Sequence, residues 1–202
     1  KKGDSEYAAN YRGITLLSTM GKLLTRIINS RLSFWAENYY VYIEAQAGFR
    51  SKMGTTDNIY VLHGLINHHI NNNLKMYCAF IDFSKAFDYL VHQNIWYKMI
   101  QLGLRGKVFN IIKSMYENVK SKIKVSNHVG ESFDCFLGVR QGECLSPFLF
   151  SLYINDLEDE LLKKGFKGVD LDFVKLYLLM YADDIVIMAQ SPSDLQKGRI
   201  LQ

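Results

Sequence analysis

The sequence predicts an α+β domain, with helices packed on an antiparallel sheet in a split β-α-β arrangement of the ferredoxin-like kind. Two observations lead to this class. From residue 76 onward the segments read as strand, helices, hairpin, helix and hairpin. The segment 173–190 (FVKLYLLMYADDIVIMAQ) holds two apolar, β-prone runs around a short break, which is typical of a hairpin. This arrangement is expected to bring strand 76–83 beside strand 173–181.

The composition is that of a globular protein. The 202 residues are 49% hydrophobic and 22% charged. No apolar run approaches the roughly 18 residues of a membrane span and no signal peptide is visible, so we expect no membrane partner. The three cysteines (Cys78, Cys135 and Cys144) lack metal-ligand spacing and indicate a reducing, intracellular compartment. Nucleus and cytoplasm both fit that expectation.

The positive charge is concentrated near the N-terminus. Residues 1–52 hold eight Lys or Arg against four acidic residues, which equals the whole net charge of +4. A solvated helix face accounts for part of this excess. A lobe that faces a polyanion accounts for it equally well.

Hydrophobic periodicity predicts the elements of the N-terminal part. In chain order, these are an extended segment (11–17), an amphipathic helix (20–37), a loop (38–55) and a second helix (56–72) capped by Thr55 or Thr56.

The remaining elements follow from alternation, periodicity and turn residues. They are a buried strand (76–83), helices at 92–102 and 105–118, a hairpin of 122–125 and 133–137, a polar loop (138–146), a helix from Ser146 to about 161, strands at 173–181 and 185–189, and a helix that begins near Ser193.

Three carboxylates fall at predicted strand ends. Asp82 ends strand 76–83, and Asp183 and Asp184 occupy the break of the last hairpin. Adjacent Asp residues in a turn often serve only as caps or solvated groups. Here they sit within a mostly apolar stretch, where burying charge costs several kcal/mol unless a cation compensates. Converging carboxylates suit Mg²⁺, and two such ions license phosphoryl or nucleotidyl transfer.

Five motifs resemble those of non-LTR (LINE-type) retrotransposon reverse transcriptases and follow one another along the chain in the order found in that family. Tyr181–Asp184 (YADD) resembles the YxDD signature, Phe80–Asp88 (FIDFSKAFD) the first palm motif, and Gly138–Phe148 (GVRQGECLSPF) the motif around the incoming nucleotide. Tyr11–Leu17 (YRGITLL) and Gln46–Asp57 (QAGFRSKMGTTD) resemble finger motifs.

The resemblance implies a right-hand polymerase: fingers over 1–75, a ferredoxin-like palm over 76–190 and the start of a further helix over 191–202. It implies an RNA-directed DNA polymerase that uses two Mg²⁺ ions (Mn²⁺ as a substitute), an RNA template, a DNA primer and deoxynucleoside triphosphates. A strand before the fingers and a thumb after the palm are expected outside these residues. The chain is thus expected to be a piece of a longer polyprotein.

Roles for the carboxylates and for one aromatic residue follow from the same resemblance. Asp82 and Asp183 would ligate both Mg²⁺ ions, with Asp184 adjacent and supporting. Phe87 matches the family's bulky gate, where a ring clashes with a ribose 2′-hydroxyl and selects deoxynucleotides. Plain core packing is the alternative for Phe87.

Four further residues are expected to bind nucleotide or template. Arg12 matches an Arg that grips the triphosphate, which suits a bidentate guanidinium. Gln141 and Gly142 would line the nucleotide pocket. Arg50 would contact the template backbone, with a plain surface charge as the alternative.

Other polar residues receive weaker assignments. Lys1 or Lys2 could assist Arg12, and Asp88 is expected to be structural, as a helix cap. The lysines of the first hairpin, Lys120, Lys122 and Lys124, fit either primer–template contacts or an exposed strand edge.

The chain also departs from the family pattern. Relatives usually read close to GFRxGRxTxD, whereas Lys52 and Met53 stand in the GR positions, and Gly13 stands where many have Pro. These departures motivate an alternative function, a catalytically inactive nucleic-acid-binding remnant of a retrotransposon polyprotein. A segment that does not fold stably alone, and a palm polymerase or cyclase acting on ribonucleotides, are further alternatives.

Overall fold

The computed structural model describes residues 4, 6–7, 10–171 and 173–198. The chain forms two compact units, each built from two stretches of sequence. The first unit comprises Lys1–Asn29 and Lys85–Tyr153, and the second comprises Ser30–Ser84 and Ile154–Gln202. The boundary near residue 75 between fingers and palm stays a prediction. None of the described helices has both the length and the apolar character that a bilayer crossing needs.

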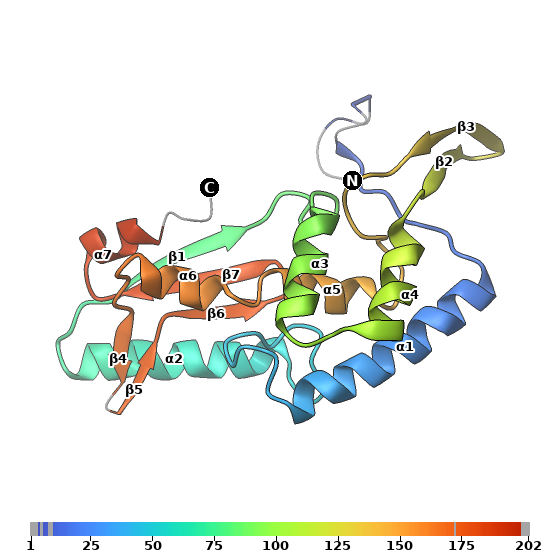
Figure 1. Cartoon of the computed structure of the whole chain (residues 1–202). Coiled ribbons are helices and arrows are strands. Elements are labelled where there is room, and N and C mark those ends of the chain that lie inside the picture. The colour runs from blue at the N-terminus through green and yellow to red at the C-terminus, as the bar shows by residue number, and fades with distance from the viewer. Residues whose placement is uncertain (1–3, 5, 8–9, 172, 199–202) are drawn as a thin grey trace. The chain divides into compact units, whose positions relative to one another are not determined.

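The helices match the hydrophobic periodicity closely (Figure 1). Their bounds are α1 Thr19–Asn38, α2 Thr55–Asn71, α3 His92–Gln101, α4 Gly106–Tyr116, α5 Ser146–Tyr153, α6 Leu157–Lys163 and α7 Pro192–Lys197. The first four confirm the predicted helices. The single helix expected from Ser146 to about 161 is wrong, because the chain leaves helical geometry after Tyr153 and α6 starts anew with Asp156 as its N-cap.

The strands form three small antiparallel sheets. Their bounds are β1 Tyr77–Asp82, β2 Lys120–Val125, β3 His128–Asp134, β4 Val169–Leu171, β5 Val174–Leu176, β6 Leu178–Tyr181 and β7 Asp184–Ala189. Both predicted hairpins exist, β2 with β3 and β6 with β7. The predicted second strand of the first hairpin, 133–137, is wrong, because β3 begins at His128 directly after a tighter turn and ends at Asp134. The expected strand 173–181 is interrupted, since its first part pairs with β4 and only its second part joins β7.

The central sheet of the second unit has the order β1-β7-β6. The prediction that strand 76–83 lies beside strand 173–181 is therefore wrong, because β1 pairs with β7. This register places Ile81 opposite Ile185, which in turn faces Met180 of β6. One row of apolar side chains thus crosses all three strands and can be buried on one face.

Helices cover both faces of this sheet. One core cluster joins α6 to the sheet, through Leu157, Leu161, Phe166, Leu178, Met180, Ile185, Ile187 and Ala189. On the other face, Leu65 of α2 packs with Leu179 and Met188. The prediction of a buried strand 76–83 is wrong, because every residue of β1 is partly buried or exposed and Phe80 is 74% exposed.

The first unit is helical, with one projecting hairpin. Helix α3 packs against α4 and α5, and the buried side chains include Ile95, Met99, Ile112 and Leu149. The β2–β3 hairpin is exposed along nearly all of both strands. Residues 11–17 form no regular strand, contrary to the expected extended element, although Thr15 donates a backbone hydrogen bond to the Gln141 carbonyl at 2.7 Å.

Helix ends in the second unit use backbone devices more than side-chain caps. The N-cap of α2 is Gly54, not Thr55 or Thr56, and its N–H donates to the Asp57 carboxylate at 2.7 Å. Helix α6 ends in a Schellman motif, in which Gly165 (φ 73°) donates to the Leu162 carbonyl and Phe166 to the Leu161 carbonyl.

Two glycines with positive φ near this helix end should respond differently to a methyl group. A Cβ on Gly168 (φ 70°) would lie 2.5 Å from the Leu176 carbonyl oxygen, whereas a Cβ on Gly165 would meet open space. We expect Gly165→Ala to lower the free energy of unfolding by about 1 kcal/mol, and Gly168→Ala by more than about 3 kcal/mol. Urea unfolding of both variants measures the difference, and equal losses would contradict this account.

Candidate functional site

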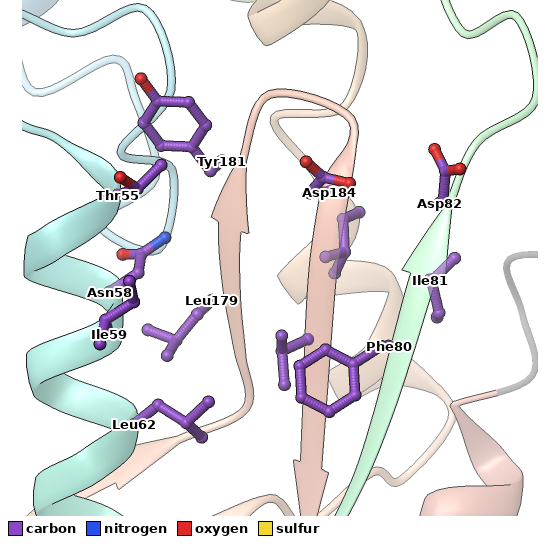
Figure 2. Close-up of a pocket in the computed structure, with 12 residues that line it drawn as sticks. Thr55, Asn58, Ile59, Leu62, Phe80, Ile81, Asp82, Leu179, Tyr181 and Asp184 are labelled. Atoms are coloured by element: carbon purple, nitrogen blue, oxygen red, sulfur yellow. The ribbon is translucent and has the colours of Figure 1, made fainter.

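Two of the predicted carboxylates face each other at one end of the central sheet. Asp82 is the last residue of β1 and Asp184 the first of β7, and the two are register partners. Figure 2 shows both carboxylates directed toward the same end of the sheet. Both residues are exposed. Side chains directly opposite on antiparallel strands have Cβ atoms about 4.5–5.5 Å apart, so the two negative charges repel unless a cation lies between them.

The third carboxylate, Asp183, occupies the turn between β6 and β7 and is partly buried. The register therefore pairs Asp82 with Asp184 and not with Asp183. Within the described ranges, no three His, Cys, Asp or Glu side chains come close enough to hold one metal ion. The structure thus pairs Asp82 with Asp184. Asp183 lies in the turn, one residue before Asp184.

This pair suits a hard divalent cation. Mg²⁺ keeps several waters and is usually bound through one or two carboxylates together with substrate phosphates. Asp82 and Asp184 supply two carboxylates that are open to solvent. The donor set therefore fits Mg²⁺ or Mn²⁺ that shares its remaining positions with water and phosphate oxygens.

A groove runs from the carboxylates down the sheet beside α2 (Figure 2). Its volume is about 350 Å³. Asp82, Asp184, Tyr181, Thr55 and Asn58 line its polar end, and the rest of the lining is apolar. The carboxylates thus border an apolar surface on the α2 side of the sheet.

The turn that carries Asp183 is held by a buried amide that sequence reasoning missed. Gln46 is 1% exposed. Its Oε1 accepts hydrogen bonds from the N–H groups of Gly48 at 2.7 Å and Ala182 at 3.0 Å. Gln46 is the first residue of the predicted finger motif 46–57. A polar residue in such a motif indicates contact with substrate as readily as burial.

In the first unit, Phe87 is partly buried and stacks on Phe150, with ring centroids 4.9 Å apart and planes inclined by 14°. This contact satisfies the packing alternative for Phe87. It also holds the ring in a fixed orientation, which a steric gate requires.

The loop expected to line the nucleotide pocket is anchored close to Asp88. The Gln141 side chain donates to the Asp88 carboxylate at 2.9 Å. A Cβ on Gly142 (φ 105°) would lie 3.1 Å from the Thr15 carbonyl oxygen, so glycine suits this close approach. Asp88 is structural as predicted, but the expected helix cap is wrong, because Val91 is the N-cap of α3.

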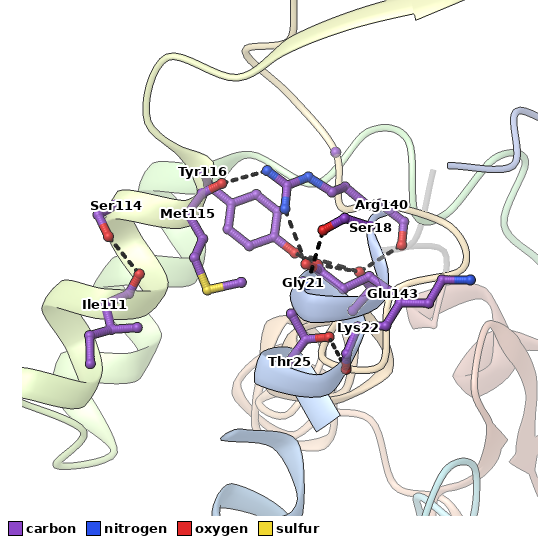
Figure 3. Close-up of polar contacts among 12 residues, drawn as sticks. Ser18, Gly21, Lys22, Thr25, Ile111, Ser114, Met115, Tyr116, Arg140 and Glu143 are labelled. Atoms are coloured by element: carbon purple, nitrogen blue, oxygen red, sulfur yellow. Dashed lines mark hydrogen bonds and ion pairs between the residues drawn. The ribbon is translucent and has the colours of Figure 1, made fainter. Parts of the chain in front are cut away.

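A buried carboxylate, also missed from the sequence, fixes the same loop (Figure 3). Glu143 is 3% exposed and accepts from the Tyr116 hydroxyl at 2.5 Å and from Arg140 at 3.1 Å. Arg140 also donates to the Met115 carbonyl and lies over the Tyr116 ring. Burial and the Glu143 charge raise the pKa of Tyr116, so its hydroxyl stays a hydrogen-bond donor.

Arg50 is engaged by protein groups in the second unit. Its guanidinium donates to both Glu37 carboxylate oxygens at 3.0 and 2.7 Å, donates to the Gln46 carbonyl at 3.3 Å, and lies over the Tyr42 ring. Its side chain is 14% exposed. Burial is the main cause that raises the pKa of Tyr42 to about 12. The predicted template contact of Arg50 stays a prediction.

The remaining predicted residues that the structure describes are exposed. Arg12 is exposed, and Lys1 and Lys2 lie outside the described residues. Lys52, in a Gly position of the family pattern, has φ 66°, the left-handed region that favours glycine. The lysines of β2 lie on the exposed hairpin, where their nucleic-acid contact stays a prediction.

Residues 1–200 match the family described as reverse transcriptase (RNA-dependent DNA polymerase). The chain belongs to the reverse transcriptase family. It is 30% identical over 189 residues to a retrovirus-related Pol polyprotein from type-1 retrotransposable element R2 of Popillia japonica, which covers 93% of this chain and 26% of that protein. It is 29% identical to the RNA-directed DNA polymerase from mobile element jockey of Drosophila funebris, over 96% of this chain and 20% of that protein.

This reverse transcriptase chain therefore spans about a quarter or less of these two relatives. Among solved structures, telomerase from Candida albicans in complex with a fragment of telomeric RNA shares the fold, with a TM-score of 0.60 and 14% identity over 87% of this chain and 31% of that one. Telomerase from Candida tropicalis gives the same TM-score of 0.60. The fold is thus that of reverse transcriptase fingers and palm.

The Arg50–Glu37 pair should contribute measurably to the stability of this member of the reverse transcriptase family. Glu37→Gln removes one charge from a bidentate, partly buried pair, and we expect a loss of about 1 kcal/mol in the free energy of unfolding. Asp170→Asn, which weakens the exposed Lys175–Asp170 pair, is the matched control and should leave the urea midpoint unchanged. Similar losses in both variants would contradict the structural role of Arg50.

Proposed function

We propose that these residues form the core of an RNA-directed DNA polymerase, which adds deoxynucleotides to a primer 3′-hydroxyl opposite an RNA template and releases pyrophosphate. The observation that carries the proposal is the pairing of Asp82 with Asp184 at the end of the sheet, in a chain of the reverse transcriptase family.

Asp82, Asp183 and Asp184 are the proposed metal ligands; Asp82 and Asp184 are register partners, and Asp183 lies in the adjoining turn. When bound, two Mg²⁺ ions would supply activation of the primer hydroxyl and stabilisation of charge on the leaving phosphate. Asp82 and Asp184 belong to strands rather than to a loop, which fixes the positions of their two negative charges. Their exposure leaves the end of the sheet open to a triphosphate.

The proposed nucleotide-binding residues all belong to the first unit. Arg12 is proposed to pair with triphosphate oxygens, which its exposed guanidinium suits. Gln141 and Gly142 are proposed to line the base and sugar pocket, supported by the anchoring of their loop at Asp88 and Thr15. Phe87 is proposed to exclude a ribose 2′-hydroxyl.

The proposed partners are an RNA template, a DNA primer and deoxynucleoside triphosphates, within a longer polyprotein. Arg50 is proposed as a template contact; its pairing with Glu37 means that a phosphate would have to share the guanidinium. The second candidate, an inactive nucleic-acid-binding remnant, is favoured by Lys52, which holds a left-handed backbone in a glycine position of the family pattern.

The carboxylate variants test the reaction directly. We expect Asp82→Asn and Asp184→Asn each to lower the rate of primer extension on an RNA template by at least about 10³-fold, because each removes metal-binding charge. Asp183→Asn tests the third carboxylate in the same assay. Asp159→Asn, an exposed residue of α6, is the control and should retain full activity.

The assay is run on these residues and on a chain extended beyond residue 202. Primer extension by either protein that is lost in the Asp82 and Asp184 variants supports the polymerase function. No extension by either protein, together with RNA binding that weakens as salt rises, supports the remnant instead. Activity that survives in Asp184→Asn would refute the proposed metal ligands.

Sugar selection gives an independent test. We expect Phe87→Ala to raise the ratio of kcat/KM for ribonucleotides to that for deoxynucleotides by about 10- to 100-fold, since losing a clash is worth about 1–3 kcal/mol. Phe136→Ala, a 79% exposed phenylalanine of the same unit, is the control. An unchanged ratio in a well-folded Phe87→Ala protein would leave Phe87 with its packing role alone.

A further inference from the structure

A short loop segment, residues 45–48, runs beside β6 and reaches the turn that carries Asp183. The Met180 N–H donates to the Ala45 carbonyl and the Ala47 N–H donates to the Met180 carbonyl, both at 2.9 Å. Gln46 and Met180 form a parallel bridge. The segment therefore extends the central sheet next to β6, although it comes from the loop between α1 and α2.

The Gln46 side chain uses both ends of its amide at this place. Oε1 accepts from the Ala182 N–H at 3.0 Å and from the Gly48 N–H at 2.7 Å, and Nε2 is 3.4 Å from the Ala182 carbonyl oxygen. Gln46 is 1% exposed and Ala182 is 6% exposed. Both backbone polar groups of Ala182 are thus served by one buried side chain, in a place that water does not reach.

The backbone at this turn needs such support. Ala182 has φ 57°, a left-handed conformation that is unfavourable for any residue with a Cβ. Ala182 is the first residue of a two-residue connection, and glycine is the usual residue at a turn position with positive φ. The hydrogen bonds from Gln46 hold Ala182, and with it Asp183 and Asp184, in this conformation.

Gly48 allows the close approach. A Cβ on Gly48 would lie 2.1 Å from the Ala182 nitrogen and 2.8 Å from the Gln46 Oε1. A methyl group there would displace the loop from the turn. Gln46 and Gly48 therefore act together, one as the hydrogen-bonding group and the other as the space that lets it approach.

We propose that Gln46 is a positioning residue of the metal site, which fixes the Ala182 turn so that Asp183 and Asp184 hold their places for cation binding. The inference rests on the proposed function for what the carboxylates bind; the contacts themselves do not. Groups that orient metal ligands without touching the metal change metal affinity when they are removed.

The decisive variant is Gln46→Met, which keeps the side-chain volume and removes all three side-chain hydrogen bonds. Gly48→Ala is the second variant, since its methyl group separates loop and turn while residue 46 is still glutamine. Gln190→Ala, an exposed glutamine of the same unit, is the control for the first, and Gly64→Ala, whose Cβ would meet open space in α2, is the control for the second.

Two quantities are measured on the full 202-residue chain: hydrogen exchange of the Ala182 amide by NMR and the Kd for Mn²⁺ by electron paramagnetic resonance. In Gln46→Met and Gly48→Ala, we expect Ala182 exchange to accelerate and Mn²⁺ binding to weaken, each by about tenfold or more. Both controls should match the parent chain. Amides of the α6-facing core, such as Ile187, should keep their protection, which separates release of the turn from global unfolding.

Two results would overturn the inference: unchanged Ala182 protection in Gln46→Met, or accelerated exchange with an unchanged Kd for Mn²⁺. If Gln46→Met loses its cooperative melt, Gly48→Ala decides by the same two measurements. A parent chain that binds no Mn²⁺ contradicts the proposed metal ligands and, with them, the positioning role. The exchange of Ala182 then still shows whether Gln46 holds the turn.

Discussion

The pairing of β1 with β7 determines where the carboxylates of Asp82 and Asp184 lie. A shift of one residue in that pairing would turn every side chain of β1 to the opposite face and separate Asp82 from Asp184. The register is held by apolar side chains that must be buried together, with Ile81 opposite Ile185 and Ala79 opposite Ile187. The same alternation that buries these residues against α6 directs the two carboxylates to the opposite face, on the side of α2. Core packing and the position of the site are therefore one constraint.

Placing two aspartates opposite each other works against stability, because like charges in facing strand positions repel. Among the residues that the structure describes, neither carboxylate takes part in a hydrogen bond or an ion pair, so a neutral pair would keep the register. Such a local conflict, in an otherwise consistent sheet, is the kind of feature that is found at functional sites. The proposed polymerase function accounts for this conflict, because a divalent cation bound between the carboxylates would offset their repulsion and hold a triphosphate.

Local patterns in the sequence were sufficient for the first four helices and for the last hairpin. Long-range choices were not predictable in the same way. Whether β1 joins β6 or β7 depends on which apolar faces meet, and both strands carry suitable residues. The broken strand at 173–181 depends on β4, a three-residue strand too short to give a signal of its own. The burial of Gln46 depends on a backbone turn far away in sequence.

Gln46 in the second unit and Glu143 in the first follow the same physical logic. Each is a buried polar side chain whose partners belong to loops that carry predicted site residues, the Ala182 turn in one case and the Arg140 loop in the other. A loop fixed by apolar contacts alone can slide, whereas a buried acceptor left without its donors is costly, so only one loop geometry is stable. Glu143 combines an ionic partner, Arg140, with the Tyr116 hydroxyl, and so tolerates full burial of its charge. Polar residues inside these motifs can therefore serve substrates indirectly, by setting the backbone that meets them.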